Sequence, residues 1–245
     1  MKIIAIGDVH GRTLWEEAVQ QDFDKVVFIG DYFDSHDEGS YAFQQIENFK
    51  NIIKFKKDNP GKVVLLLGNH DYHYLPGVKE HYSGYQGHMA LDIQEVLREN
   101  MDHLKICHIE GEYLFVHAGI TKTWYKNIVE QDNLFGIPEL YSLEEQINNL
   151  FIFKPNYFGF SPGNYHDPYG NETCQSPIWV RPESLVRDKI EGYIQVVGHT
   201  TQLDGIKQDK GIILIDTLIF DNPQYLVIED NKALGTTMSP RAVEL

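Results

Sequence analysis

Cysteine is scarce in this 245-residue sequence, and its two residues, Cys107 and Cys174, are too few for a framework of disulfides. No apolar run approaches the ~18 residues that span a bilayer, so we expect no membrane segment. Both absences favour a reduced protein of the cytoplasm. The apolar stretch from Met1 to Gly7 is far too short for a signal sequence and runs directly into polar residues, so we interpret it as a strand.

Basic side chains are also few, because Lys and Arg total 21 against 36 Asp and Glu, which gives a net charge of -15. This acidic balance argues against binding along a nucleic acid backbone, which requires basic stripes. A small phosphorylated substrate stays open, because a bound metal ion can invert the local field. The hydrophobic content of 42% is ample for a core, and the length predicts a single domain over residues 1–245.

Short apolar runs, many of them ending at a glycine, predict the strands. They cover Lys2 to Ile6, Val26 to Ile29, Val63 to Leu67, Leu104 to His108, Tyr113 to Val116, Tyr193 to Val197, Ile212 to Ile215 and Tyr225 to Ile228. Helices are predicted near residues 14–21, 40–57, 88–100, 122–131, 142–150 and 183–190. Two irregular excursions interrupt the pattern, namely 72–88, which we expect to be a surface loop, and 153–178. This alternation predicts an α/β fold of two packed sheets with helices outside.

Polar side chains stand where the predicted strands end. They are Asp8 and His10, Asp31 and Asp34, Asn69 and His70, His117, and His199. Each group adjoins a glycine, which lets the backbone turn sharply and a ligand come close. If the chain stays extended, Asp8 and His10 lie on one side of it. Carboxylates, an amide and imidazoles without a thiolate suit Mn, Fe or Zn better than Ca or Mg.

The number of candidate ligands fits two metal ions with Asp31 as a bridge. The first ion would be held by Asp8, His10 and Asp31, and the second by Asp31, Asn69, His117 and His199. The charge of two divalent ions exceeds that of the two carboxylates, so the pocket would attract phosphate. The two ions would share a hydroxide that attacks phosphorus directly.

His70 is left over beside the predicted ions, and we assign it as the general acid that protonates the leaving oxygen. Asp34 is the candidate acceptor of its other ring proton. Arg181 would supply a forked donor to the phosphate oxygens. Asp71, next to His70, is better interpreted as a cap of the following helix.

Five ordered motifs of this chain resemble the calcineurin-like metallophosphoesterases. They are Gly7-Asp-Val-His-Gly11, Gly30-Asp-Tyr-Phe-Asp34, Gly68-Asn-His-Asp71, His117-Ala-Gly119 and Gly198-His-Thr200. Within that superfamily the chain is similar to the phosphoprotein-phosphatase branch, which includes small phage and bacterial Ser/Thr protein phosphatases and symmetrical diadenosine tetraphosphatases. The last motif lacks the second histidine of the Gly-His-x-His pattern of the nuclease and phosphodiesterase branches, and Ile178-Trp-Val-Arg181 matches a stretch whose arginine contacts phosphate.

The resemblance implies a sandwich of two mixed sheets flanked by helices, with a dinuclear metal site at the carboxyl ends of the strands. Mn²⁺ is the favoured ion, with Fe or Zn as alternatives. One motif departs from the branch, because Ser35-His36 stands where Arg-Gly is usual and a phosphate-binding arginine is therefore absent. Either another group replaces it, with His36, Tyr72 and His73 as candidate substrate contacts, or the substrate differs.

The sequence therefore predicts a metal-dependent phosphomonoesterase that acts on a phosphoprotein or a small phosphorylated compound. The alternative is a symmetrical dinucleoside polyphosphate hydrolase, in which the aromatic residues of 72–88 and 153–178 would stack on bases. A third hypothesis, from another class, is a binding module that keeps the fold and has lost turnover.

Overall fold

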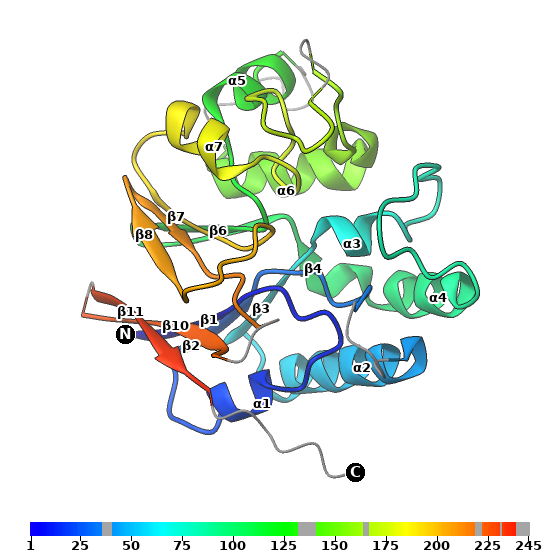
Figure 1. The fold of residues 1–245 in the computed structure, drawn as a ribbon, viewed down its shortest axis with the longest axis vertical. Coiled ribbons are helices and arrows are strands. Elements are labelled where there is room, and N and C mark those ends of the chain that lie inside the picture. The colour runs from blue at the N-terminus through cyan, green and yellow to red at the C-terminus, as the bar shows by residue number, and fades with distance from the viewer. Residues whose placement is uncertain (36–40, 132–140, 164–166, 219–221, 231, 239–245) are drawn as a thin grey trace.

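Two β-sheets packed face to face form the centre of the protein, and helices cover their outer faces (Figure 1). The structure is a computed structural model that describes residues 1–35, 41–131, 141–163, 167–218, 222–230 and 232–238. This arrangement is the α/β fold that the sequence predicts.

The six-stranded sheet has the strand order β11-β10-β1-β2-β3-β4. Its strands are β1 (Lys2–Ile6), β2 (Lys25–Phe28), β3 (Val63–Leu66), β4 (Leu104–Lys105), β10 (Gln224–Glu229) and β11 (Lys232–Thr237). The strands β1 to β4 are parallel, whereas β10 and β11 pair antiparallel, so the sheet is mixed. The parallel strands end at one edge, where their following residues can meet.

The five-stranded sheet has the strand order β5-β6-β7-β9-β8. Its strands are β5 (Cys107–Glu110), β6 (Tyr113–Val116), β7 (Ile194–Val197), β8 (Lys207–Asp209) and β9 (Ile212–Leu214). Here β6, β7 and β9 are parallel, and β5 and β8 are antiparallel edge strands. This sheet is mixed as well.

Helices lie on both outer sides of the sandwich (Figure 1). The α-helices are α1 (Trp15–Ala18), α2 (Ala42–Asp58), α3 (Asn69–Tyr72), α4 (Ala90–Asn100), α5 (Lys122–Trp124), α6 (Leu143–Phe153) and α7 (Pro182–Asp188). Short 3-10 turns, η1 (Met101–His103) and η5 (Pro155–Phe158), and one π turn, η2 (Tyr125–Val129), adjoin them. In Figure 1 α5, α6 and α7 lie beyond the five-stranded sheet, and α1 and α2 lie beyond the six-stranded one.

Strand β1 shows how the sequence builds the two hydrophobic cores. Ile3 and Ala5 join the cluster between the sheets, whereas Ile4 and Ile6 join the cluster on the helix side. Successive side chains of a strand point to opposite faces, and here both faces are covered. A strand buried on both faces is apolar throughout, which is why these runs are visible in the sequence.

The structure differs from the predicted elements in three places. The predicted strand from Leu104 to His108 is divided at Ile106, so that β4 pairs with β3 while β5 pairs with β6 in the other sheet. The edge strands β8 and β11 escape prediction, because most of their residues are exposed and form no apolar run. The predicted surface loop is wrong for residues 72–75, which are buried.

Two expectations from the absences in the sequence can be compared with the structure. Neither Cys107 nor Cys174 forms a disulfide. None of the helices in the described ranges is both long and apolar enough to cross a membrane.

Candidate metal centre

The carboxyl ends of strands from both sheets bring the predicted ligands together. Asp8 follows β1, Asp31 follows β2, and Asn69 begins α3 just after β3 of the six-stranded sheet. His117 follows β6 and His199 follows β7 of the five-stranded sheet. The candidate site therefore spans the two layers.

The backbone is strained at this site. His10, Asp31, Asp34 and His199 adopt positive φ angles of 44°, 51°, 64° and 60°. A non-glycine residue in this left-handed region costs roughly 1–3 kcal/mol, and such residues cluster at functional sites. The chain is thus not extended at His10, contrary to the sequence argument, yet ligand atoms of Asp8, His10 and Asp31 lie within 4.8 Å of one another.

Electron-rich atoms face one another across the site. Asp31 Oδ2 lies 3.7 Å from His10 Nε2 and 3.4 Å from His117 Nε2. Asn69 Oδ1 lies 2.9 Å from His117 Nε2 and 2.8 Å from His199 Nδ1. Asp31 therefore approaches one histidine from each of the two predicted ligand sets.

The opposite nitrogen of each imidazole is held by a backbone carbonyl. The pairs are His10 Nδ1 with Phe33 O (2.7 Å), His117 Nδ1 with Ile29 O (3.0 Å) and His199 Nε2 with Trp179 O (3.2 Å). A ring that donates to a carbonyl keeps a lone pair on its inward nitrogen when it is neutral. Burial favours the neutral rings, since it lowers the pKa of His117 to about 3 and takes the pKa of His10 and of His199 well below the ordinary value.

The lone pairs of His10 and His117 point at the Asp31 carboxylate, and these atoms repel one another unless a cation lies between them. The outer carbonyls are also the partners that metal-bound histidines usually have, because they orient the ring and fix its tautomer. The residues present therefore fit a centre of divalent metal ions with mixed nitrogen and oxygen ligands.

The carboxylates of the site point to the same conclusion. Asp8 and Asp31 are 2% and 1% exposed. Burial raises the pKa of both, and a neighbouring carboxylate raises it further, Asp216 for Asp8 and Asp8 for Asp31. A bound cation would offset both the desolvation and the repulsion, and would keep the carboxylates ionised.

Asp216 is a buried residue of this site that the sequence prediction omits. It lies two residues after β9, so the same strand-end pattern that identifies the other carboxylates was available to find it. Asp71 also has a larger role than predicted. It caps α3 by accepting from Gly68 N at 2.9 Å, and it accepts as well from Asp31 N at 2.9 Å and Tyr32 N at 2.7 Å. The carboxylate of Asp71 therefore fixes the turn that carries Asp31.

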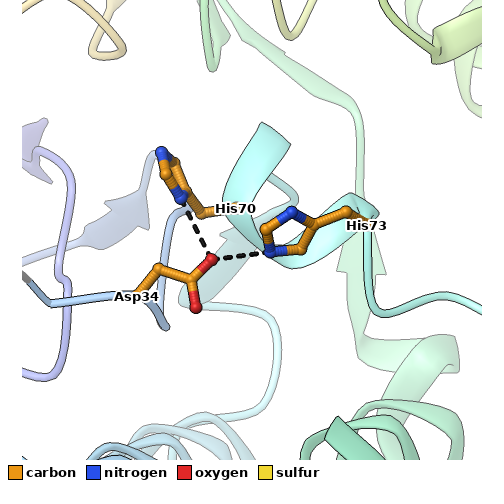
Figure 2. Close-up of side chains that lie close together, drawn as sticks. All are labelled: Asp34, His70 and His73. Atoms are coloured by element: carbon orange, nitrogen blue, oxygen red, sulfur yellow. Dashed lines mark hydrogen bonds and ion pairs between the residues drawn. The ribbon is translucent and has the colours of Figure 1, made fainter. Parts of the chain in front are cut away.

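Asp34, His70 and His73 form a second cluster, in which one carboxylate oxygen meets two imidazoles (Figure 2). Asp34 Oδ2 lies 3.1 Å from His70 Nδ1 and 2.6 Å from His73 Nε2. Although burial opposes ionisation, hydrogen bonds from His70, His73 and Tyr74 lower the pKa of Asp34 to about 2. The second ring nitrogen of His70 points away from Asp34, and the His70 ring centroid lies 5.1 Å from that of His10.

Arg181 lies beside the metal centre, immediately before α7. Its Nη1 donates to His199 O at 3.0 Å and to Thr200 Oγ1 at 3.1 Å, and its Nε donates to Tyr169 O at 2.8 Å. Among the residues that the structure describes, Nη2 has no hydrogen-bond acceptor. The guanidinium is thus held in place with one amino group left for a ligand.

The remaining candidate substrate contacts are Tyr72, His73 and His36. Tyr72 and His73 are each 2% exposed. The Tyr72 hydroxyl donates to Pro155 O at 3.0 Å, and His73 faces Asp34. Both side chains therefore have protein partners and little exposed surface, and their role as substrate contacts stays a prediction. His36 lies outside the described residues.

Comparison with known proteins gives one family and two curated relatives. The sequence model of the family described as Calcineurin-like phosphoesterase matches residues 1–202. The chain is 26% identical over 135 residues to the symmetrical bis(5'-nucleosyl)-tetraphosphatase of Nitrosospira multiformis, which covers 51% of this chain and 46% of that protein. It is 25% identical over 122 residues to the serine/threonine-protein phosphatase 4 catalytic subunit of Eremothecium gossypii, which covers 47% and 37%. The chain thus aligns with less than half the length of either relative.

Solved structures share the fold at low identity. A cold-active protein-tyrosine phosphatase from a psychrophilic Shewanella has a TM-score of 0.63 and 18% identity, covering 97% of this chain and 80% of that one. A protein serine/threonine phosphatase from Saccharomyces cerevisiae has a TM-score of 0.56 and 13% identity, covering 100% and 81%. These similarities show the arrangement of sheets and helices.

Proposed function

The chain belongs to the calcineurin-like phosphoesterase family, and we propose that it is a metal-dependent phosphatase that hydrolyses phosphomonoesters of a phosphoprotein or a small phosphorylated compound. One observation carries this proposal. Buried carboxylate, amide and imidazole atoms converge next to His70, and the carboxylate and imidazole atoms repel one another unless a cation lies between them.

The ligand sets follow from the distances. We propose that Asp8, His10 and Asp31 hold one ion and that Asp31, Asn69, His117 and His199 hold the other. When bound, two divalent ions supply charge neutralisation and acidify water that attacks phosphorus. Mn²⁺ is the first choice for this donor set, with Fe or Zn as alternatives.

The side chains around the centre orient the substrate and supply a proton. His70 Nδ1 is engaged by Asp34, so its Nε2 is the nitrogen that holds a proton for the leaving oxygen. Asp34 stays anionic and fixes the orientation and tautomer of His70. The fixed guanidinium of Arg181 directs Nη2 toward a phosphate oxygen, which supplements the charge of the centre.

A second candidate function is hydrolysis of a symmetrical dinucleoside polyphosphate. Aromatic rings extend outward from the centre: the Trp179 ring centroid lies 5.8 Å from that of His199 and 4.3 Å from that of Tyr82. Nearby, Tyr85 and His81 stack at 3.8 Å. Aromatic rings of this kind stack on nucleobases, and the Nitrosospira relative is named as a symmetrical tetraphosphatase.

Parallel assays separate the candidates. The chain, purified with Mn²⁺, is given a phosphoserine peptide, p-nitrophenyl phosphate and diadenosine tetraphosphate at equal concentrations. Release of inorganic phosphate from the first two supports the phosphomonoesterase, and symmetrical cleavage to ADP without phosphate supports the second candidate. An Asp31→Asn variant should lose whichever activity is found, which excludes a contaminating enzyme.

Failure in these assays also has a defined meaning. A chain that binds no metal and hydrolyses none of the three substrates with added Mn²⁺ would overturn both enzyme proposals and support the binding module. Of the possible compartments, we propose the cytoplasm, because the two free thiols suit a reducing environment. The acidic composition supports a substrate other than a nucleic acid backbone.

A further inference from the structure

We propose that His73 is a positioning residue. It holds the carboxylate of Asp34 in the orientation in which that carboxylate hydrogen-bonds to His70. The inference rests on the proposed function, because it assigns His73 a part in delivering the proton that His70 gives to the leaving oxygen. His73 itself is buried and reaches neither the metal centre nor a substrate.

The first support is the number of donors around Asp34. Oδ2 faces His70 Nδ1 at 3.1 Å and His73 Nε2 at 2.6 Å. Oδ1 accepts from the Tyr74 hydroxyl at 2.5 Å and from Gln86 Nε2 at 3.1 Å. With donors on both oxygens the carboxylate cannot rotate freely, and the oxygen shared with His70 is the one that His73 holds.

The second support is the tautomer of His73. The backbone N–H of Tyr82 donates to His73 Nδ1 at 3.2 Å, so Nδ1 is an acceptor and the proton of the neutral ring lies on Nε2. Burial lowers the pKa of His73, which favours this neutral form. Nε2 is buried without a regular hydrogen bond in the described part of the chain, and it lies 2.6 Å from Asp34 Oδ2, so the carboxylate is the group placed to receive its proton.

The third support is the packing that holds the His73 ring. Its centroid lies 4.5 Å from that of Tyr74 and 5.1 Å from that of Tyr85, both edge to face, and 5.8 Å from that of Tyr82 in a parallel arrangement. Three aromatic neighbours leave the imidazole little rotamer freedom. A fixed ring with a fixed tautomer is what a positioning role requires.

A metal ion between these three side chains is the competing interpretation, because their ligand atoms lie within 4.8 Å of one another. The geometry argues against it. The backbone N–H of Tyr82 donates to His73 Nδ1, so the neutral ring carries its proton on Nε2 and has no lone pair there for a cation. The 2.6 Å between His73 Nε2 and Asp34 Oδ2 is instead the length of a charge-assisted hydrogen bond.

The catalytic consequence concerns substrates that need a proton. In hydrolysis the oxygen of water bonds to phosphorus, the bond from phosphorus to the leaving oxygen breaks, and the proton on His70 Nε2 passes to that oxygen. A serine alkoxide needs this proton, whereas p-nitrophenolate is a stable anion that leaves without it. Loss of His73 should therefore harm turnover of the first kind of substrate and spare the second.

The kinetic test compares His73→Phe with His73→Gln in the intact chain loaded with Mn²⁺. Phe fills the space without a donor, and Gln restores an N–H that can reach Asp34. We expect His73→Phe to lower kcat on a phosphoserine peptide by about 10-fold, with KM and the kcat on p-nitrophenyl phosphate changed by less than about 2-fold. His73→Gln should recover most of the loss, and the exposed His88→Phe is the matched control that should change neither rate.

A double-variant comparison shows whether His73 acts through His70. His70→Asn should increase the preference for p-nitrophenyl phosphate over the peptide more than His73→Phe does, and adding His73→Phe to it should lower the rate no further. Equal losses on both substrates, or additive losses in the double variant, would overturn the positioning role. A wild-type chain that hydrolyses neither substrate would instead overturn the proposed function itself.

A measurement on the wild-type chain keeps the inference testable even if the variants fail to fold. Two-dimensional NMR of the chain labelled with 15N at histidine reports the tautomer of each ring. We expect His73 to carry its proton on Nε2, with this spectrum unchanged by addition or removal of Zn²⁺, a diamagnetic ion that does not broaden the histidine signals. The proton on Nδ1, or loss of the Nε2 proton on addition of metal, would refute the arrangement.

Discussion

A methyl group added at Gly68 tests whether the close packing around Asp31 builds the metal centre. The backbone at Gly68 has φ −103° and ψ 179°, which alanine adopts without strain. A Cβ at this position would overlap Asp31 Oδ1, and it would lie 2.5 Å from Asp31 N and 2.8 Å from Asp31 Cγ. The substitution Gly68→Ala therefore acts by displacing the side chain of Asp31 and the turn beneath it.

The size of the effect follows from the overlap. Overpacking a tight site costs typically about 1–3 kcal/mol, and here the neighbour that must move includes backbone, so we expect about 3 kcal/mol. For a chain of this length this corresponds to a fall in Tm of roughly 6–12 °C. The displaced Asp31 should also weaken metal binding by at least about 10-fold.

Thermal denaturation and metal analysis of the purified variant measure both effects. Gly87→Ala is the matched control, since its Cβ would meet Tyr85 at an ordinary 3.6 Å and should leave Tm and metal content unchanged. A Gly68→Ala protein with the Tm and metal content of the control would refute the reasoning that Asp31 is fixed by this contact.

Two further predictions concern charge. Glu144 accepts a hydrogen bond from Ile109 N at 2.8 Å and pairs with His108 and Lys105. Although burial opposes ionisation of this carboxyl, the hydrogen bonds lower its pKa to about 2 from an ordinary 4.5. A depressed carboxyl pKa contributes stability that is present above the unfolded pKa and lost as the pH falls through the folded pKa. In urea denaturation the free energy of unfolding of Glu144→Gln should thus be about 1–3 kcal/mol below that of the wild type between pH 7 and 5. This difference between the two proteins should become smaller below pH 4.5. A difference in stability that does not depend on pH would contradict this, and the exposed Glu99→Gln should show no difference from the wild type. For the metal centre, we expect metal analysis to find two ions per chain after loading with Mn²⁺. The number should fall to one in His199→Ala and to near zero in Asp31→Asn, because Asp31 Oδ2 approaches both ligand sets. Equal stoichiometry in the two variants would exclude the bridging position.

The parts of this fold that were predictable are those in which one short segment carries the whole signal. Asp8, Asp31, His117 and His199 each follow a buried apolar strand, so strand and ligand appear side by side in the sequence. Both faces of these strands are covered, which makes the runs continuous and easy to find. The strand ends of two sheets then bring the ligands to one place.

The parts that were not predictable depend on contacts between distant segments. Ile106 continues an apolar run, and nothing local shows that the chain changes sheets there. Asp34 and His73 form a pair although they are 39 positions apart in the chain. Which ring nitrogen of His73 carries the proton depends on the hydrogen bond from the backbone of Tyr82. A histidine in a tyrosine-rich segment therefore looks like a surface residue until the packing is known.

The strain at His10 and Asp31 also limits what the sequence can show. An Asp-x-His pattern after a strand predicts two side chains on one side of an extended chain, but His10 has a φ of 44°. The ligands meet because the turn folds back, with His10 N donating to Asp31 O at 2.6 Å. The sequence pattern therefore named residues that do lie together, but for a partly wrong geometric reason.

The distribution of ligands over both sheets has a consequence for the whole molecule. An ion held by Asp31 from one layer and by His117 from the other, as we propose, would act as a non-covalent cross-link between them. By mass action its binding free energy adds to the resistance of the sandwich to opening. Removing the ions should therefore speed amide hydrogen exchange in β1, β2, β6 and β7, well beyond the loops that carry the ligands.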